Sequence, residues 1–138
     1  MALTFRYKGV KRPHGVVKTP SIPITFKGLT ETIEVIALLD SGADLSAISK
    51  DFAELLGLEL TGKKEPVRGI GGEVDAVETK TWISLGKDRE KYNFLIPVKV
   101  LLTKDDFGII LERAGFFDKF LITFDESNEK VVLKRRQA

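Results

Sequence analysis

The apolar residues of this chain fall in short runs, and this pattern constrains the fold more than any other feature of the sequence. The runs are either continuously apolar or alternate with polar residues, and glycine, proline and charged clusters separate them. Such runs are typical of strands, whereas an amphipathic helix repeats apolar residues at spacings of three and four. The strands expected on this basis span residues 4–8, 21–26, 32–39, 74–85, 92–102, 108–111, 120–124 and 131–133. The sequence therefore predicts a mainly β fold.

One segment has helical periodicity instead. Phe52, Leu55 and Leu56 lie at positions i, i+3 and i+4, so they share one helical face. Ser49 is a suitable N-cap before them, and Gly57 is a suitable stop after them. We expect one short helix between Ser49 and Gly57.

Aromatic and glycine-rich segments give further local expectations. Residues 67–74 are predicted to form a hairpin with a glycine-dense tip. Residues 113–119 are predicted to form a helical turn that carries Phe116 and Phe117. These two phenylalanines and Trp82 are expected in the core, and lining of a pocket is the alternative for one of the three.

The length of 138 residues suits one domain with its own core, and is too short for two ordinary domains. Hydrophobic residues make up 43% of the chain and charged residues 30%, which is the balance of a folded globular protein. We expect residues 1–138 to form a single domain. Residues 1–20 are then a basic N-terminal segment, and residues 120–138 a closing hairpin with a basic tail.

The chain has no cysteine, which excludes disulfides, thiolate metal sites and a cysteine nucleophile. The only histidine is His14, which lies in a basic, turn-like stretch. We therefore give little weight to a histidine zinc site or a Ser-His-Asp triad. No metal or organic cofactor is expected.

Charge is unevenly distributed although the net charge is only +2. Residues 1–30 contain six basic side chains and no acidic one, and Lys134, Arg135 and Arg136 add a basic tail. This arrangement keeps a nucleic-acid-associated domain as a minor alternative, although nucleic acid is not the partner we expect. The N-terminus lacks the apolar region of a signal peptide, and no apolar run approaches the roughly 20 residues that span a bilayer. We expect a cytoplasmic protein without membrane association.

The sharpest chemical feature is Asp40, a carboxylate at the end of five apolar residues, 35–39. A carboxylate at a buried strand end needs hydrogen-bond donors, which the Ser41 hydroxyl and the backbone amides near Gly42 can provide. The alternative is a turn in which Asp40 caps its own backbone, as Asp before Ser-Gly often does. The apolar residues before Asp40 argue against a surface turn.

Residues 39–44, Leu-Asp-Ser-Gly-Ala-Asp, resemble the active-site loop of the retropepsin-like aspartic proteases, single-domain relatives of the retroviral proteases. Residues 69–72, Gly-Ile-Gly-Gly, begin 29 residues after Asp40 and resemble the glycine-rich tip of the family's flap. Residues 109–113 lie where the family carries two hydrophobic residues followed by Gly-Arg. The resemblance implies a retropepsin-like acid protease barrel with one short helix, active as a two-fold dimer.

The chemistry implied by this resemblance is attack of water on a peptide bond, with two carboxylates sharing one proton. This chain offers one such aspartate, because Asp106-Phe107-Gly108 lacks the serine or threonine that follows the catalytic residue. The resemblance therefore implies a homodimer with Asp40 of each subunit as the catalytic residue and a peptide or protein as substrate.

The resemblance also assigns roles to the surrounding residues. Ser41 and Gly42 support the active-site loop, while Ala43 and Asp44 contact the substrate backbone. Substrate-binding residues are also expected at the flap tip, and a further segment lies beside the active site. The flap residues are Gly69, Ile70, Gly71 and Gly72, and the adjacent segment is Ile110, Leu111, Glu112 and Arg113.

Glu112 departs from the family, which usually has glycine at this position. Either its side chain points outward without consequence, with Arg113 compensating its charge, or the floor of the active site is altered. A carboxylate close to Asp40 would disfavour the ionised form of the dyad. We favour the outward orientation, because the adjacent Arg113 can compensate the charge of Glu112. Glu112 also motivates the main alternative function, a non-catalytic dimeric module of the same fold that binds peptides or proteins.

Overall fold

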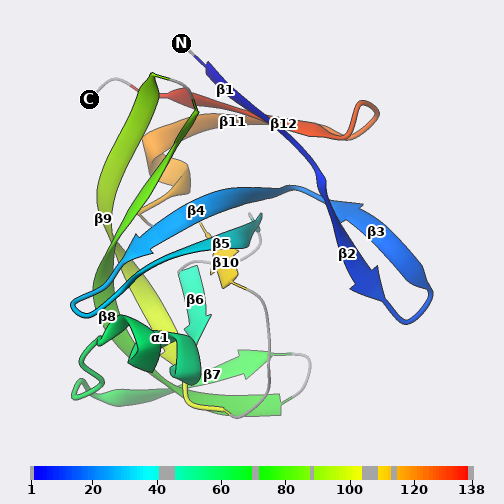
Figure 1. Ribbon diagram of the computed structural model, residues 1–138. Coiled ribbons are helices and arrows are strands. Elements are labelled where there is room, and N and C mark those ends of the chain that lie inside the picture. The colour runs from blue at the N-terminus through cyan, green and yellow to red at the C-terminus, as the bar shows by residue number, and fades with distance from the viewer. Residues whose placement is uncertain are drawn as a thin grey trace.

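The computed structural model of the chain describes residues 2–40, 46–69, 72–87, 89–103, 109–112 and 115–136. Most of these residues are in strands, as the apolar pattern predicts (Figure 1). The elements in chain order are β1 (Ala2–Arg6), β2 (Lys8–Arg12), β3 (Gly15–Thr19), β4 (Ser21–Lys27), β5 (Thr32–Leu39), β6 (Ser46–Ser49), α1 (Lys50–Leu56), β7 (Lys64–Gly69), β8 (Gly72–Lys87), β9 (Glu90–Leu101), β10 (Ile109–Leu111), the 3-10 turn η1 (Phe117–Lys119), β11 (Phe120–Asp125) and β12 (Lys130–Arg135).

The strands of the described residues form three sheets. The largest has the order β4-β5-β10-β6-β9-β8-β7, and β4 also pairs with β8. This extra pairing curls the sheet back on itself, so its inner face encloses the core in the manner of a barrel. The order β1-β12-β11 makes a second sheet from the two ends of the chain, and β2 pairs only with β3.

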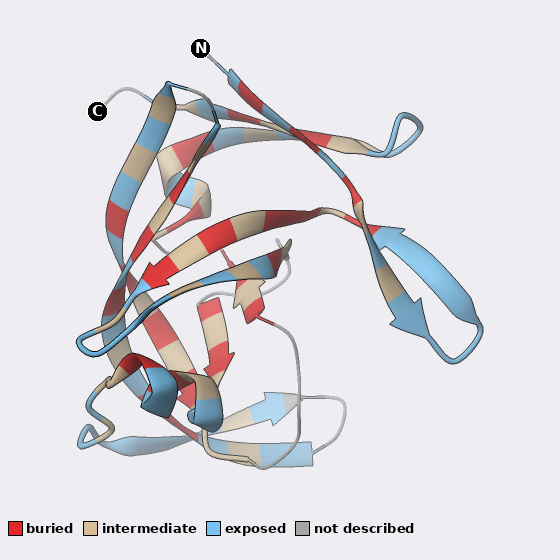
Figure 2. Ribbon diagram, in the orientation of Figure 1, coloured by how far each residue is buried: buried red, intermediate tan, exposed pale blue. Residues whose placement is uncertain are grey.

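The core fills the inside of the largest sheet. Alternation in β4 places Ile22, Ile24 and Phe26 on the inner face, where each is at most 1% exposed. Figure 2 shows buried residues along the long strands of this sheet. The side chains of Leu3, Val131 and Leu133 extend the same core from the second sheet. One continuous core therefore joins the two larger sheets.

The helix forms where the sequence predicts it. The amide of Phe52 donates to the Ser49 hydroxyl at 3.2 Å, and Gly57 ends the helix with φ 73°. Phe52 meets Phe26 edge to face, with ring centroids 5.1 Å apart. Both predicted helix ends are confirmed.

Local structure differs from the sequence pattern in three places. Trp82 is not in the core, because it lies 50% exposed on the outer face of β8. It lines a shallow cavity, which is the alternative role given above for one of the three aromatic residues. The apolar end of β5 is not continuously buried: Ala37 and Leu39 are buried, whereas Ile36 is 49% exposed, since the core covers only one face of this strand. Residues 8–19 form the β2–β3 hairpin, although their polar, basic composition predicts no strand beyond residue 8.

Candidate active site

Asp40 follows β5 directly, and neighbouring segments fix its backbone from both sides. β5 runs parallel to β10, with Ile110 opposite Leu38 and Leu111 opposite Leu39. The Asp40 amide donates to the Leu111 carbonyl at 2.9 Å, and the Leu39 amide donates to the Pro20 carbonyl at 2.9 Å. The chain therefore enters the predicted loop with its direction set by two segments that are distant in sequence, β10 and the segment at Pro20.

Burial changes sharply at this point. Leu39 is 4% exposed, and Asp40 is half-buried. A half-buried carboxylate at the rim of an apolar core is less hydrated than one in a surface turn. This position agrees with a functional carboxylate better than with an ordinary turn residue.

Glu112 is buried, at 5% exposed, so the outward orientation favoured from the sequence is wrong. Its amide donates to the Ser46 hydroxyl at 3.1 Å, and its carbonyl accepts from the Phe117 amide at 3.3 Å. The residue directly after Leu111 is thus enclosed by β6 and by the turn before β11. The alternative interpretation, in which Glu112 alters the floor of the active site, stays a prediction.

Ser46 is a residue of this site that the sequence analysis missed. It is 1% exposed at the start of β6, and its hydroxyl connects β6 to the end of β10. Ala47 pairs with Ile110 one residue further along. A serine six residues after Asp40 carries no distinguishing signal in the sequence, because only the fold brings it opposite Glu112.

The predicted hairpin near residue 70 is confirmed in its paired part. β7 and β8 pair antiparallel up to Gly69 and Gly72, and Gly72 has φ 115°, a value that side chains other than glycine rarely adopt. Arg68 and Glu73 form an exposed ion pair at 3.3 Å beside this end. Two glycines therefore mark the point at which the chain reverses.

The structure brings only part of the predicted site together. Asp40, Ile110, Leu111 and Glu112 lie side by side, whereas Gly69 and Gly72 are on a hairpin at the other end of the sheet order. Other predicted site residues lie outside the described residues, namely Ser41, Gly42, Ala43, Asp44, Ile70, Gly71 and Arg113.

Neither a metal site nor a membrane-spanning helix is present in the part of the chain that the structure describes. Within it, no group of three or more histidine, cysteine, aspartate or glutamate side chains is arranged to hold a metal ion. No helix there is long and apolar enough to cross a membrane.

Comparison with known proteins agrees with this geometry. The sequence model of the family described as "Aspartyl protease" matches residues 22–100, which is more than half of the chain. The crystal structure of a retropepsin-like aspartic protease from Rickettsia conorii has a TM-score of 0.60 and 17% identity, over 96% of this chain and 98% of that chain. The EIAV protease complexed with the inhibitor HBY-793 has a TM-score of 0.47 and 23% identity, over 75% of this chain and 88% of that chain. No curated protein sequence gives a significant match. The expected mainly β, retropepsin-like fold is confirmed.

Proposed function

Because the chain belongs to the aspartyl protease family, we propose that it is an aspartic endopeptidase whose active site contains Asp40 from each of two identical subunits. One Asp40 is ionised and takes a proton from water as the water oxygen attacks the peptide carbonyl carbon. The other Asp40 is protonated and donates a hydrogen bond to the carbonyl oxygen. The tetrahedral intermediate then loses its C–N bond as a proton passes to the leaving nitrogen.

One observation carries this proposal: the Asp40 amide is bonded to the Leu111 carbonyl at the end of two parallel strands. A dyad needs two carboxylates at a fixed separation, and a backbone held in this way limits where each one can lie. Asp40 also lies half-buried at the rim of the core. The substrate is a peptide or protein.

The remaining residues have supporting roles in this proposal. The Ser41 hydroxyl and the Gly42 amide stabilise the loop that carries the dyad. Ala43 and Asp44 contact the peptide backbone, and residues 69–72 form a flap that covers the bound peptide and excludes water. These roles are assigned to residues of this chain because the sequence resembles the family's motifs at the same positions.

The buried Glu112 favours a second candidate, a dimeric module that binds peptides without cleaving them. Glu112 stands where the family usually has glycine, and it is enclosed directly after the strand that pairs with the Asp40 strand. The two candidates share fold, groove and subunit arrangement, and they differ only in whether a bound peptide is hydrolysed.

Cleavage of a diverse peptide pool separates the two candidates. The wild type and Asp40→Asn are compared by mass spectrometry at equal concentration, from acidic to neutral pH. Asp51→Asn serves as the matched control, because it makes the same chemical change in the first turn of α1. The proposal expects cleavage by the wild type and the control, and none by Asp40→Asn. Equal cleavage by Asp40→Asn, or binding of peptides without cleavage by a wild-type dimer, contradicts it.

A further inference from the structure

Residues 8–19 form an arm, the β2–β3 hairpin, which leaves the body of the molecule. Its strands pair with each other from Lys8 opposite Thr19 to Arg12 opposite Gly15. Figure 2 shows β3 exposed over nearly all its length, and Val16 and Val17 are 65% and 49% exposed. A two-stranded hairpin is at best marginally stable alone in water. Burial of exposed valines against another surface lowers the free energy and so stabilises such a contact. The arm is therefore suited to docking on another surface.

The body of its own chain does not cover the arm. A cavity of about 530 Å³ separates β2 from the outer side of β5 and β10. Val10 lines it on the arm side, and Ile36, Leu38 and Ile110 line it on the body side. The arm therefore meets its own chain mainly at its base.

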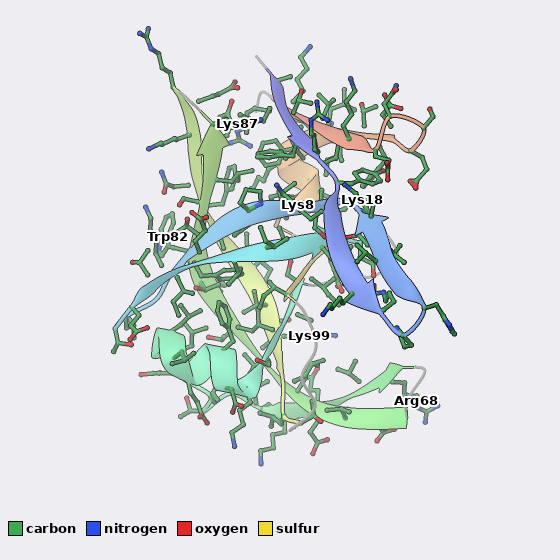
Figure 3. The ribbon with its side chains drawn as sticks, turned by 45° about the vertical axis from the view of Figure 1, so that its right-hand side comes forward. Lys8, Lys18, Arg68, Trp82, Lys87 and Lys99 are labelled. Atoms are coloured by element: carbon green, nitrogen blue, oxygen red, sulfur yellow. The ribbon has the colours of Figure 1, made fainter. Side chains whose placement is uncertain are left out.

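The charge of the arm defines what it can dock on. It carries Lys8, Lys11, Arg12 and Lys18, and no carboxylate lies between residues 8 and 19. Figure 3 shows Lys8 and Lys18 on the two strands of the arm. An acidic surface with exposed apolar side chains would complement both the cations and the valines.

The β11–β12 turn has this chemistry. Residues 125–129 contain Asp125, Glu126 and Glu129 and no cation. Hydrogen bonds from the Asn128 side chain (2.9 Å) and the Asn128 amide (3.2 Å) to the Asp125 carboxylate lower the pKa of Asp125, so it stays ionised at neutral pH. Phe124, next to the turn, is 40% exposed. The turn is an acidic surface with an apolar neighbour.

The arm and the turn are placed so that each can serve a second copy. The Tyr7 hydroxyl donates to Glu126 at 3.2 Å and the Tyr7 amide donates to the Glu129 carbonyl at 2.8 Å, so the base of the arm is fixed beside the turn. From this base the arm and the turn diverge, and both project from the same side of the molecule (Figure 1). In a two-fold dimer an arm–turn contact is made twice, because each subunit supplies one arm and one turn.

We propose that the arm of each subunit docks on the acidic β11–β12 turn of a second copy of this chain. The proposal rests on the proposed function in one respect, because the Asp40 dyad is incomplete without a second copy. The contact holds the two subunits together from a surface that lies outside the active-site loop. The arm then affects catalysis only by stabilising the dimer.

Reversal of charge tests the contact. Lys11→Glu/Arg12→Glu changes the arm, and Glu126→Lys/Glu129→Lys changes the turn. Sedimentation equilibrium at low ionic strength should show a dimeric wild type and, for each variant alone, a dimer dissociation constant raised at least about tenfold by like charges. An equimolar mixture of the two variants should regain the dimer, because every reversed arm then meets a reversed turn.

Two controls separate the contact from general effects of the substitutions. Tyr7→Phe removes the hydrogen bond to Glu126, which the turn variant also loses, without a change of charge. It keeps the bond from the residue 7 amide to the Glu129 carbonyl, which holds the base of the arm in place, so the dimer should be unchanged. Lys80→Glu/Lys91→Glu makes the same charge change as the arm variant on exposed positions of β8 and β9, and should also leave it unchanged.

A monomeric wild type, variants that dimerise like the wild type, or a mixture that stays monomeric overturns the proposal. So does an arm variant whose only loss is affinity for a nucleic acid. Failure of the protease proposal looks different. The wild type then dimerises and the charge-reversal variants lose and regain the dimer as expected, yet the wild-type dimer cleaves no peptide.

Discussion

The amide of Asp40 donates a 2.9 Å hydrogen bond to the carbonyl oxygen of Leu111, although 71 residues separate the two in sequence. This bond continues the parallel pairing of β5 with β10 by one residue, to the point at which the chain leaves the sheet. Leu111 is fully buried, so its position is set by the core. The candidate catalytic residue is therefore held by the packing of the whole domain.

Substitution of Ser46 by alanine should weaken this arrangement. The hydroxyl of Ser46 accepts the Glu112 amide at 3.1 Å in a buried environment, and its removal leaves that amide without this acceptor. We expect the free energy of unfolding to fall by about 1–3 kcal/mol, measured by urea denaturation. We also expect kcat/KM to fall further than this loss of folded protein accounts for. Unchanged stability would show that the hydrogen bond contributes nothing to the floor of the site.

Substitution of Gly72 by alanine should strain the β7–β8 hairpin. The φ of Gly72 is 115°, and an added Cβ would meet no atom within 4 Å, so the penalty is conformational rather than steric crowding. We expect a loss of about 1–3 kcal/mol in unfolding free energy, with reduced peptide cleavage because the end of the proposed flap is displaced. Wild-type stability and activity in this variant would contradict the positive φ.

Tyr7 should make stability fall at alkaline pH. Burial raises the pKa of Tyr7 above its usual value of 10.0, and the hydrogen bond to Glu126 raises it further. Because the pKa of Tyr7 is raised in the folded state, its contribution to the free energy of unfolding is complete below pH 10. That contribution is lost as the pH rises through the folded-state pKa. Tyr7→Phe should show a shallower alkaline decline than the wild type in urea denaturation. Identical declines in the two proteins would refute this role.

Trp82 provides a direct optical check on the fold. It is the only tryptophan of the chain and is 50% exposed on β8. The native protein should have red-shifted tryptophan emission that iodide quenches readily, since half of the side chain is open to solvent. A blue-shifted emission that resists quenching by iodide would place Trp82 in the core, as expected for a large aromatic side chain from the sequence alone.

Much of the fold could be predicted because local chemistry and the final packing agree. The expected strand at residues 32–39 has the observed bounds, and the helix lies between Ser49 and Gly57 as its capping residues indicate. Asp40 was identifiable for the same reason: a carboxylate at the end of an apolar strand is visible in the sequence itself. Local patterns were sufficient wherever a residue's role depends on its neighbours in the chain.

The remainder depended on contacts between distant segments. Trp82 is exposed because only one face of β8 meets the core, and no local pattern indicates which face that is. Ser46 acquires its role only when β6 lies beside β10. The arm has only three valines, which do not alternate regularly with its basic and polar residues, so the arm carries no strand signal of its own. Glu112 is enclosed by segments on both sides, whereas its charge alone predicts exposure.

The central claim is that one active site contains Asp40 from two subunits, and subunit mixing tests it most directly. Wild-type protein is held at a fixed concentration, and Asp40→Asn is added in increasing excess while peptide cleavage is measured. Exchange of subunits is verified by native mass spectrometry of the mixed dimers. The account predicts that activity falls as mixed dimers replace wild-type dimers, because each mixed dimer has a single Asp40. Activity that stays constant while mixed dimers form would contradict the account, since each chain would then be catalytic by itself.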